Sequence, residues 1–455
     1  ARTFFRDHEL FCIEFADAGR SPFPPFVNIS QCRTEEVLDA RIAENDLVDV
    51  RWSHRVTGVR DGEDGVEVAV ETPAGPQVLR APYVVACSGA HSEPIRGSLG
   101  VRFDGRSFHD HFLICDIRAD LPGWEQERRF YFDPEWNPGR QVLIHPCPES
   151  TYRIDWQVPA DFDLAAEEAG GGLEARIRKI IGDRDFEIVW KSVYRFHSRC
   201  VDRMRQGRVL LAGDCAHLVA PFGARGLNSG VADAENAAWK LAFVLRGWAS
   251  PRLLDSYDAE RRAAAQENLE VTTATMNFLV PQTPEARRRR TELLERAVDE
   301  PETQSQVDSG RLAEPFWYVD SPLTTPDPSR SPATRPERGK LPPPGVGVLL
   351  PDLPVRSARP PVAGRLRELA RLGVLVLVAD EEDLATAEET ARAVLTCPLH
   401  VRSMRELTGD TALVDLLGAR AGEAWVVRPD AFTAAVVPAG DRAALAEALR
   451  RLSGR

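Results

Sequence analysis

The chain has 455 residues, of which 43% are hydrophobic and 28% charged, as in ordinary globular proteins that fold around their own core. Its net charge of −12 and the lack of a basic stripe argue against nucleic acid as a partner, and no run of about 18 apolar residues indicates a membrane span. The eight cysteines form no CxxC pair and no zinc spacing with histidine, so we expect no metal site and a cytoplasmic protein.

The first hundred residues alternate predicted strands and helices. Apolar residues on both sides of Asp7-His8 predict a hairpin over residues 2–15, and residues 34–45 carry apolar side chains at helical spacing. A short apolar run that ends in Ser88-Gly89 predicts a buried strand opening into a tight turn. β-branched or alternating residues predict strands at 48–52, 55–60, 66–72 and 83–87.

The next hundred residues predict an antiparallel sheet, since short strands are separated by turns rich in Gly, Pro and Asn. In the segment Tyr152-Arg153-Ile154-Asp155-Trp156, successive side chains must point to opposite faces of the sheet, so about half of them face inward. A helix is expected at 173–182. Strands are expected at 112–117, 129–132, 141–145, 152–158 and 186–196.

The chain then returns to strand, loop and long helices up to about residue 320. Prolines recur over residues 321–344 and predict a semi-rigid linker. The segment after it alternates helix and strand, which predicts a small α/β unit. Its expected elements are a helix at 363–372 and strands at 374–378, 399–402 and 425–427.

The most informative stretch runs from Gly207 to Leu245. Residues 209–212 predict a buried strand, and Asp214 follows at its C-terminal end, where α/β folds bind ligands. Residues 221–226 form a loop punctuated by glycines, which lets the backbone approach a ligand closely. The sequence therefore predicts a ligand site at this strand end.

A helix follows this loop, with Asn228 or Ser229 as its N-cap and Gly247 just after its end. A loop that leads into a helix N-terminus attracts anions, because unpaired N–H groups and a partial positive charge point outward there. The predicted apolar face of this helix consists of Val231, Ala234, Ala238, Leu241, Ala242 and Leu245.

This stretch resembles the GD motif of the class A flavin-dependent monooxygenases, the para-hydroxybenzoate and phenol hydroxylase type, close to the 3-(3-hydroxyphenyl)propionate hydroxylases. The resemblance is strongest over residues 193–262 and extends to Glu260-Arg261-Arg262. It implies an enzyme that uses FAD, NAD(P)H and O2 to hydroxylate a small phenolic or other aromatic substrate through a flavin C4a-hydroperoxide.

The resemblance also implies cofactor-binding residues. Asp214 would bind the ribityl chain, and the loop with the helix N-terminus would contact the flavin ring, where N–H donors stabilise developing negative charge. Arg225 would add positive potential, and Gln31 resembles the start of a helix beside the flavin. The implied set is Gly213, Asp214, Pro221, Gly223, Arg225, Gly226, Leu227, Asn228 and Gln31.

The implied fold is of the mixed α/β class: a truncated, Rossmann-like FAD-binding domain, an inserted antiparallel-sheet substrate domain, and a C-terminal thioredoxin-like domain. The tail resemblance includes Arg428-Pro429-Asp430 and lacks a cysteine pair, so we expect packing or dimerisation there, with a homodimer as one assembly. The expected divisions are 1–100 and 201–320 for the FAD-binding domain, 101–200 for the substrate domain, 321–344 for the linker and 345–455 for the tail.

Three departures from the family stand out. No GxGxxG follows a predicted strand, so we expect residue 1 to lie after the first βαβ unit, and either the chain is a fragment or the protein has lost tight dinucleotide binding. Ser88 stands where the family has an aspartate that touches flavin and nicotinamide nucleotide. The arginine that the family has after that turn is displaced by one position here, to Arg96. The alternative interpretation is that Arg96 is an ordinary surface arginine.

The catalytic residues stay open at this stage. A phenol needs a base or hydrogen-bond partner to gain phenolate character, and His145, Tyr194 and His197 are the candidates. His217 is a further candidate to line the cavity. The alternative function is a non-catalytic protein, or an inactive fragment, that binds an aromatic ligand on the same fold. The missing fingerprint and Ser88 favour this alternative, whereas the intact loop around Asp214 opposes it.

Overall fold

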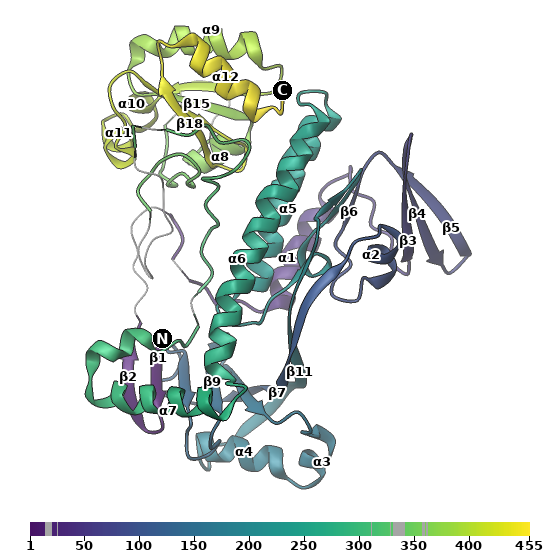
Figure 1. Cartoon of the computed structure of the whole chain (residues 1–455), viewed down its shortest axis with the longest axis vertical. Coiled ribbons are helices and arrows are strands. Elements are labelled where there is room, and N and C mark those ends of the chain that lie inside the picture. The colour runs from purple at the N-terminus through teal and green to yellow at the C-terminus, as the bar shows by residue number, and fades with distance from the viewer. Residues whose placement is uncertain are drawn as a thin grey trace.

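The computed structural model describes residues 1–13, 21–24, 26–310, 312–327, 329–330, 342–356, 360 and 363–455. Residues 14–15 of the predicted hairpin and residues 328 and 331–341 of the predicted linker lie outside this set. The described chain mixes helices and sheets, which confirms the predicted fold class. Figure 1 shows the helices α5 (Arg225–Leu245) and α6 (Asp255–Leu279) between a large sheet and the C-terminal part of the chain. No described helix is both long and apolar enough to cross a lipid bilayer.

The large sheet contains every strand predicted between residues 112 and 196, so those predictions are confirmed. The predicted hairpin also forms, but it joins this sheet: β1 runs parallel to β8, while the other neighbours in the sheet are antiparallel. In sheet order the strands are β14 (His217–Leu218), β11 (Phe186–Val201), β7 (Phe103–Ala119), β10 (Thr151–Val158), β9 (Gln141–Cys147), β8 (Arg129–Phe132), β1 (Arg2–Phe5) and β2 (His8–Cys12).

The two faces of the large sheet have different chemistry. One face is apolar and buries Tyr152 and Trp156 of β10 against the helix α4 (Gly172–Ile181), which follows α3 (Leu164–Ala169). Because side chains alternate along a strand, Arg153 and Asp155 point to the opposite face, which borders a cleft. Packing against α4 therefore decides which half of β10 is available to a ligand.

Two smaller sheets lie before and after the large one in sequence. Their strands are β3 (Arg55–Gly62), β4 (Gly65–Thr72) and β5 (Gly75–Ala81) in one, and β12 (Arg205–Gln206), β13 (Val209–Leu211) and β6 (Val84–Ala86) in the other. The parallel pair β6–β13 brings the Ser88 turn beside the end of the strand that precedes Asp214. This pairing places two distant sequence motifs next to each other.

The strand predicted at 48–52 is wrong. This segment has no regular structure, and the Trp52 side chain is 78% exposed. A strand must pair its backbone N–H and C=O groups with a neighbour, and no described strand lies alongside this segment. The predicted helix at 34–45 is confirmed as α1 (Gln31–Ala43), but its apolar Val37, Leu38 and Ile42 are exposed.

The helix α5 begins earlier than predicted. Its N-cap is Ala224, in a left-handed conformation with φ of 56°, instead of Asn228 or Ser229. Its predicted apolar face is also wrong, since Val231 and Leu245 are exposed, whereas Asp233 and Lys240 are buried. Hydrophobic periodicity failed here because α5 packs against α6 partly through buried ion pairs. After α6 come α7 (Pro284–Asp299) and the 3₁₀ turn η3 (Pro301–Gln306).

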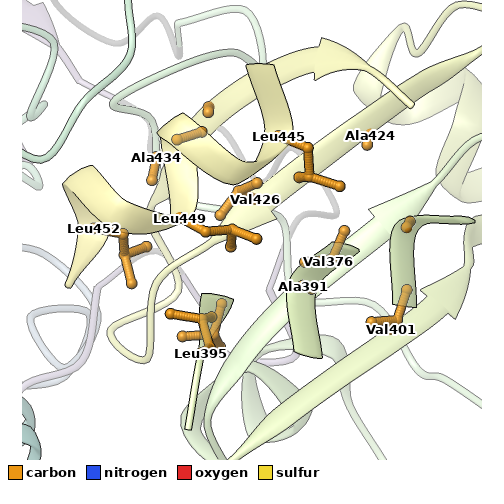
Figure 2. Packing of buried hydrophobic residues seen from close by; sticks show 14 of the residues in the cluster. Val376, Ala391, Leu395, Val401, Ala424, Val426, Ala434, Leu445, Leu449 and Leu452 are labelled. Atoms are coloured by element: carbon orange, nitrogen blue, oxygen red, sulfur yellow. The ribbon is translucent and has the colours of Figure 1, made fainter. Parts of the chain in front are cut away.

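The C-terminal part contains a mixed sheet, called the C-terminal sheet below, whose strands and first helix confirm those predicted. Figure 2 shows its core, where Leu445 and Leu449 pack near Val426. Trp239 and Phe243 of α5 belong to the same core. The strands in order are β16 (Leu399–Ser403), β15 (Val374–Val378), β17 (Glu423–Val427) and β18 (Thr433–Pro438), and the helices are α8 (Leu366–Arg371), α9 (Leu384–Val394), α10 (Met404–Thr408), α11 (Ala412–Leu417) and α12 (Arg442–Leu452).

Candidate functional site

A cleft of about 1870 Å³ lies between the start of α5 and the exposed face of the large sheet. Its volume exceeds the roughly 300–1000 Å³ of a pocket for one small ligand. Gly213 does not line the cleft, whereas the next residue, Asp214, does. The predicted cofactor residues that do line the cleft are Asp214, Pro221, Gly223, Arg225, Gly226, Leu227, Asn228 and Gln31.

Asp214 lies in the 3₁₀ turn η1 (Gly213–Cys215), directly after β13. Gly213 has a φ of 59°, which an L-residue adopts only with strain, so glycine permits this sharp turn. The Asp214 carboxylate faces the cleft and has no hydrogen-bond partner among the described residues. Its partial burial raises the pKa of the carboxyl. A ligand hydroxyl could therefore donate to this carboxylate.

Asp233, which sequence reasoning missed, holds this turn in place from α5. Its carboxylate accepts a hydrogen bond from the Gly213 N–H at 2.9 Å and pairs with Arg261 of α6 at 2.6 Å. It also lies 2.8 Å from His217 Nε2. Burial alone would raise the pKa of Asp233, but Arg261 and His217 hold it below its ordinary value. His217, predicted to line the cavity, is instead buried in this cluster.

The start of α5 presents backbone N–H groups to the cleft, since the first turn of a helix has no internal acceptors for them. Gly226 leaves open space where a side chain would stand, so a planar ligand could approach the backbone. The buried Arg225 side chain donates to Asn268 Oδ1 of α6 and to the Leu312 carbonyl, at 3.1 Å for the latter. It thus anchors the helix start as well as placing positive charge there.

Three phenylalanines connect the loop before α5 to the large sheet. Phe222 of the loop packs edge-on against Phe112 of β7 and Phe196 of β11, with ring centroids 5.8 Å and 6.0 Å apart. Phe112 and Phe196 stack on each other at 4.4 Å. All three rings line the cleft. They fix the spacing between its two sides and provide an apolar wall for an aromatic ligand.

The sheet side of the cleft also carries ionisable groups. Arg153 of β10 binds Asp116 of β7 through two hydrogen bonds of 2.7 Å and 2.8 Å. The next inward residue on β10 is Asp155, whose Oδ2 lies 4.0 Å from His145 Nε2 of β9. Burial raises the pKa of Asp155 to about 7. Burial, with the neighbouring Arg128 and Arg153, holds the pKa of His145 well below its usual range.

The three candidate catalytic residues have different positions. His145 and Tyr194 line the cleft. His197 is not among the described residues that line it, and its Nδ1 lies 2.8 Å from Ser107 Oγ. The register of β11 shifts between Arg195 and His197, so the alternation that would predict its direction from Tyr194 breaks there.

The Ser88 turn contacts the Asp214 turn through Arg96. This arginine is buried, so it is not an ordinary surface residue. It donates to the Cys215 carbonyl at 3.1 Å and to the Ala90 carbonyl at 3.0 Å. Ser88 Oγ lies 2.6 Å from Ser92 Oγ. Arg96 therefore connects the two turns that the family resemblance assigns to the cofactor.

Comparison with known proteins identifies flavin-dependent relatives of this chain. A family model for the FAD binding domain matches residues 13–272, more than half of the chain. The 3-(3-hydroxy-phenyl)propionate/3-hydroxycinnamic acid hydroxylase of Mycolicibacterium smegmatis is 33% identical over 264 residues, 58% of this chain and 46% of that protein. The 12-dehydrotetracycline 5-monooxygenase/anhydrotetracycline 6-monooxygenase of Streptomyces rimosus is 35% identical over 271 residues, 58% and 53% of the two chains.

Among solved structures, a ternary complex of aklavinone-11 hydroxylase with FAD and aklavinone matches with a TM-score of 0.70 at 26% identity. The match covers 96% of this chain and 81% of that one. The chain spans about half the length of the curated relatives it matches. The family match shows that the chain belongs to the FAD binding domain family, and these relatives bear out the resemblance to class A flavin-dependent aromatic monooxygenases drawn from the GD motif.

Proposed function

We propose that this chain binds FAD and positions an aromatic substrate for hydroxylation with O2 and NAD(P)H. One observation carries the proposal: Asp214 and the N–H groups that begin α5 lie in the same cleft as the aromatic and ionisable residues of the large sheet. A cofactor on one side and a ring on the other would then meet within a single cavity. The alternative, a non-catalytic aromatic-binding protein, uses only the sheet side.

The residues present fit the flavin half of FAD. The unpartnered carboxylate of Asp214 suits the hydroxyls of a ribityl chain, and the bare backbone at Gly226 suits a flat ring. The helix N-terminus favours negative charge near that ring. When bound and reduced, flavin supplies the electrons that activate O2 for transfer to the substrate.

The chain's own residues would orient the substrate and exclude water. Phe112, Phe196 and Phe222 form a wall across the cleft between its two sides. An apolar wall of this kind keeps water away from reactive oxygen species and strengthens the polar contacts around the ring. These residues support a phenolic or polycyclic substrate, as the names of the hydroxyphenylpropionate, tetracycline and aklavinone enzymes also suggest.

The C-terminal part supports this function by packing. Arg428 and Asp430 are buried against α5 and α6, where Trp239 Nε1 donates to Asp430 at 3.0 Å and Arg428 pairs with Glu260. This supports the packing role expected for the Arg428-Pro429-Asp430 segment. The homodimer and the cytoplasmic location remain predictions.

Flavin fluorescence tests the proposal. Riboflavin binding requires only the contacts to the flavin ring and the ribityl chain. We therefore expect the chain to quench the fluorescence of riboflavin saturably, and to quench that of FAD in the same way. Asp214→Asn should weaken riboflavin binding roughly tenfold or more, the effect of losing a hydrogen bond to a charged group. The control Asp104→Asn changes an exposed carboxylate at the start of β7 and should leave binding unchanged.

The two functions give different results in a second step. Oxidation of NAD(P)H by the FAD-loaded chain, accelerated by a phenol and accompanied by a hydroxylated product, would establish the hydroxylase chemistry. Aromatic binding without any flavin binding would support the non-catalytic alternative. Riboflavin binding that is equal in the chain and in Asp214→Asn would contradict the assignment of the flavin side.

A further inference from the structure

Two residues on the sheet side of the cleft have buried polar atoms without a hydrogen-bond partner among the described residues. Asp155 Oδ1 is buried and has no hydrogen-bond partner among the described residues. The same holds for both side-chain atoms of Gln141, a residue that is only 1% exposed. Both residues line the cleft. Buried polar groups are nearly always paired in native proteins, so this pattern indicates that a ligand supplies the partner.

Sheet register places these groups side by side. Asp155 lies opposite Leu143, and Gln141 and His145 are the residues two positions to either side of Leu143 on β9. Diagonal neighbours of this kind are about 7–8 Å apart. On this face of the sheet, Asp155 therefore lies between the Gln141 amide and the His145 imidazole. The partner of Asp155 on β7 is Ile114, and Phe112 is two residues from Ile114 on the same strand.

The charges that face Asp155 leave its carboxylate available. Arg153, on the same strand, already has both hydrogen bonds of a bidentate pair with Asp116 of β7. Arg128, which precedes β8, opposes the effect of burial only in part, and Asp116 adds to it. Burial holds the pKa of His145 well below its usual range, which favours the neutral imidazole. Among the described residues, no neighbouring cation thus forms a hydrogen bond with Asp155 Oδ1.

We propose that Asp155 is the proton acceptor for a phenolic hydroxyl group of the substrate. The substrate O–H bond breaks, the proton bonds to Asp155 Oδ1, and the electron pair stays on the phenolic oxygen and spreads into the ring. This deepens the proposed function and rests on it, because only an oxygen-transferring partner on the flavin side makes use of an electron-rich ring. Gln141 offers a donor and an acceptor to a second oxygen substituent of the same ring system.

The energetics favour this assignment over an ordinary carboxylate. A phenol ionises near pH 10, about six units above an ordinary aspartate. Burial raises the pKa of Asp155 to about 7, which narrows the gap to about three units. A general base works best when its pKa lies near the working pH. Asp155 could thus share or take the phenolic proton, which an exposed aspartate could not do to any useful extent.

The test compares two ligands of the same shape. 2-Naphthol carries a phenolic O–H, and its methyl ether, 2-methoxynaphthalene, does not. By calorimetry at about pH 8, where the Asp155 carboxyl is ionised, the chain should bind the naphthol roughly tenfold or more tightly, as expected for a hydrogen bond to a charged group. Below about pH 6 the preference should shrink, because a protonated carboxyl can donate to either oxygen.

Variants make the outcome specific. Asp155→Asn should bring the naphthol-to-ether preference close to one and remove its pH dependence, while Asp104→Asn should keep both. Equal binding of the two ligands by the unaltered chain, or an undiminished preference in Asp155→Asn, would overturn the proposal. Riboflavin quenching, measured on the same samples, reports separately on the proposed function. It should be unchanged in Asp155→Asn, and its absence from the unaltered chain would count against the flavin site instead.

Discussion

Two regions of the molecule bury polar or charged side chains, and they differ in whether these side chains have partners. The paired network, between α5, α6 and the C-terminal sheet, gives its charged groups partners of opposite sign. The sheet side of the cleft pairs Arg153 with Asp116 but leaves Asp155 Oδ1 and the side-chain amide of Gln141 without a partner among the described residues. The paired network consists of Asp233, Lys240, Glu260, Arg261, Arg428 and Asp430.

Glu260 is the centre of the paired network. It accepts from Arg428 at 2.5 Å and 2.9 Å and from Lys240 at 2.6 Å, and all three side chains are nearly inaccessible to solvent. Burial would raise the pKa of Glu260, but these two cations hold it well below its ordinary value. Next to Glu260 on α6, Arg261 holds Asp233, which in turn holds the turn of Asp214.

The two regions therefore differ in role: one stabilises the fold, and the other is open to a ligand. Burying a charge is costly unless a partner compensates for it, so a satisfied buried network fixes one arrangement of the elements around it. Unmatched buried polar atoms are a cost that a protein retains where a ligand can make up for it. The first region therefore positions the turn of Asp214 and the start of α5, and the second region carries the contacts that we propose for the substrate.

The largest expected effect comes from Glu260→Gln. It removes the anion that compensates Lys240 and Arg428, so the free energy of unfolding should fall by about 3–5 kcal/mol. Urea denaturation measures this loss. Because the pKa of Glu260 is lowered in the folded state, its stabilisation is present above the ordinary value near 4.5 and fades as the pH falls below it. The pH dependence should be weaker in the variant.

A matched control uses an exposed pair in the C-terminal part. Glu389 binds Arg442 at 2.8 Å, and both side chains are more than half exposed. Glu389→Gln should cost no more than about 1 kcal/mol. Losses of the same size in the two variants would show that burial does not distinguish them, and would break the contrast between paired and unmatched charges.

Asp155→Asn should have the opposite sign and a smaller size. The raised pKa of Asp155 means that the folded state loses stability as the pH rises from about 4, the ordinary value, to about 7. Removing the charge should stabilise the protein by about 1–3 kcal/mol above pH 7, with little effect below pH 4. Thermal unfolding across this pH range measures it. Destabilisation at high pH would show that Asp155 has a partner in the ligand-free chain.

Apart from the control variants, Gly213→Ala is expected to have the smallest effect, a loss of about 1–2 kcal/mol from forcing an L-residue into the left-handed region. No atom obstructs the added methyl group, so the cost is conformational. Gly226→Ala, in the first turn of α5 and equally unobstructed, should be neutral or stabilising. Chemical denaturation of the two variants compares them. Equal effects would remove the reason for a glycine before Asp214.

Much of the site was predictable because it is local in sequence. The strand, Gly213-Asp214 and the glycine loop are consecutive, and the structure places Asp214 and the loop residues along one cleft. The direction of Asp155 was not predictable, because alternation along β10 gives two faces and only the packing of α4 selects one. The buried face of α5 was mispredicted because Asp233 and Lys240 are buried through partners distant in sequence.

The most direct measurement titrates 2-naphthol into the chain saturated with riboflavin and follows the riboflavin absorption spectrum. If the two sides of the cleft serve one reaction, both ligands bind together, and the aromatic ring perturbs the flavin spectrum in proportion to its occupancy. The volume of about 1870 Å³ leaves room for both. Displacement of riboflavin by 2-naphthol, or naphthol binding that leaves the flavin spectrum unchanged, would contradict a shared cleft.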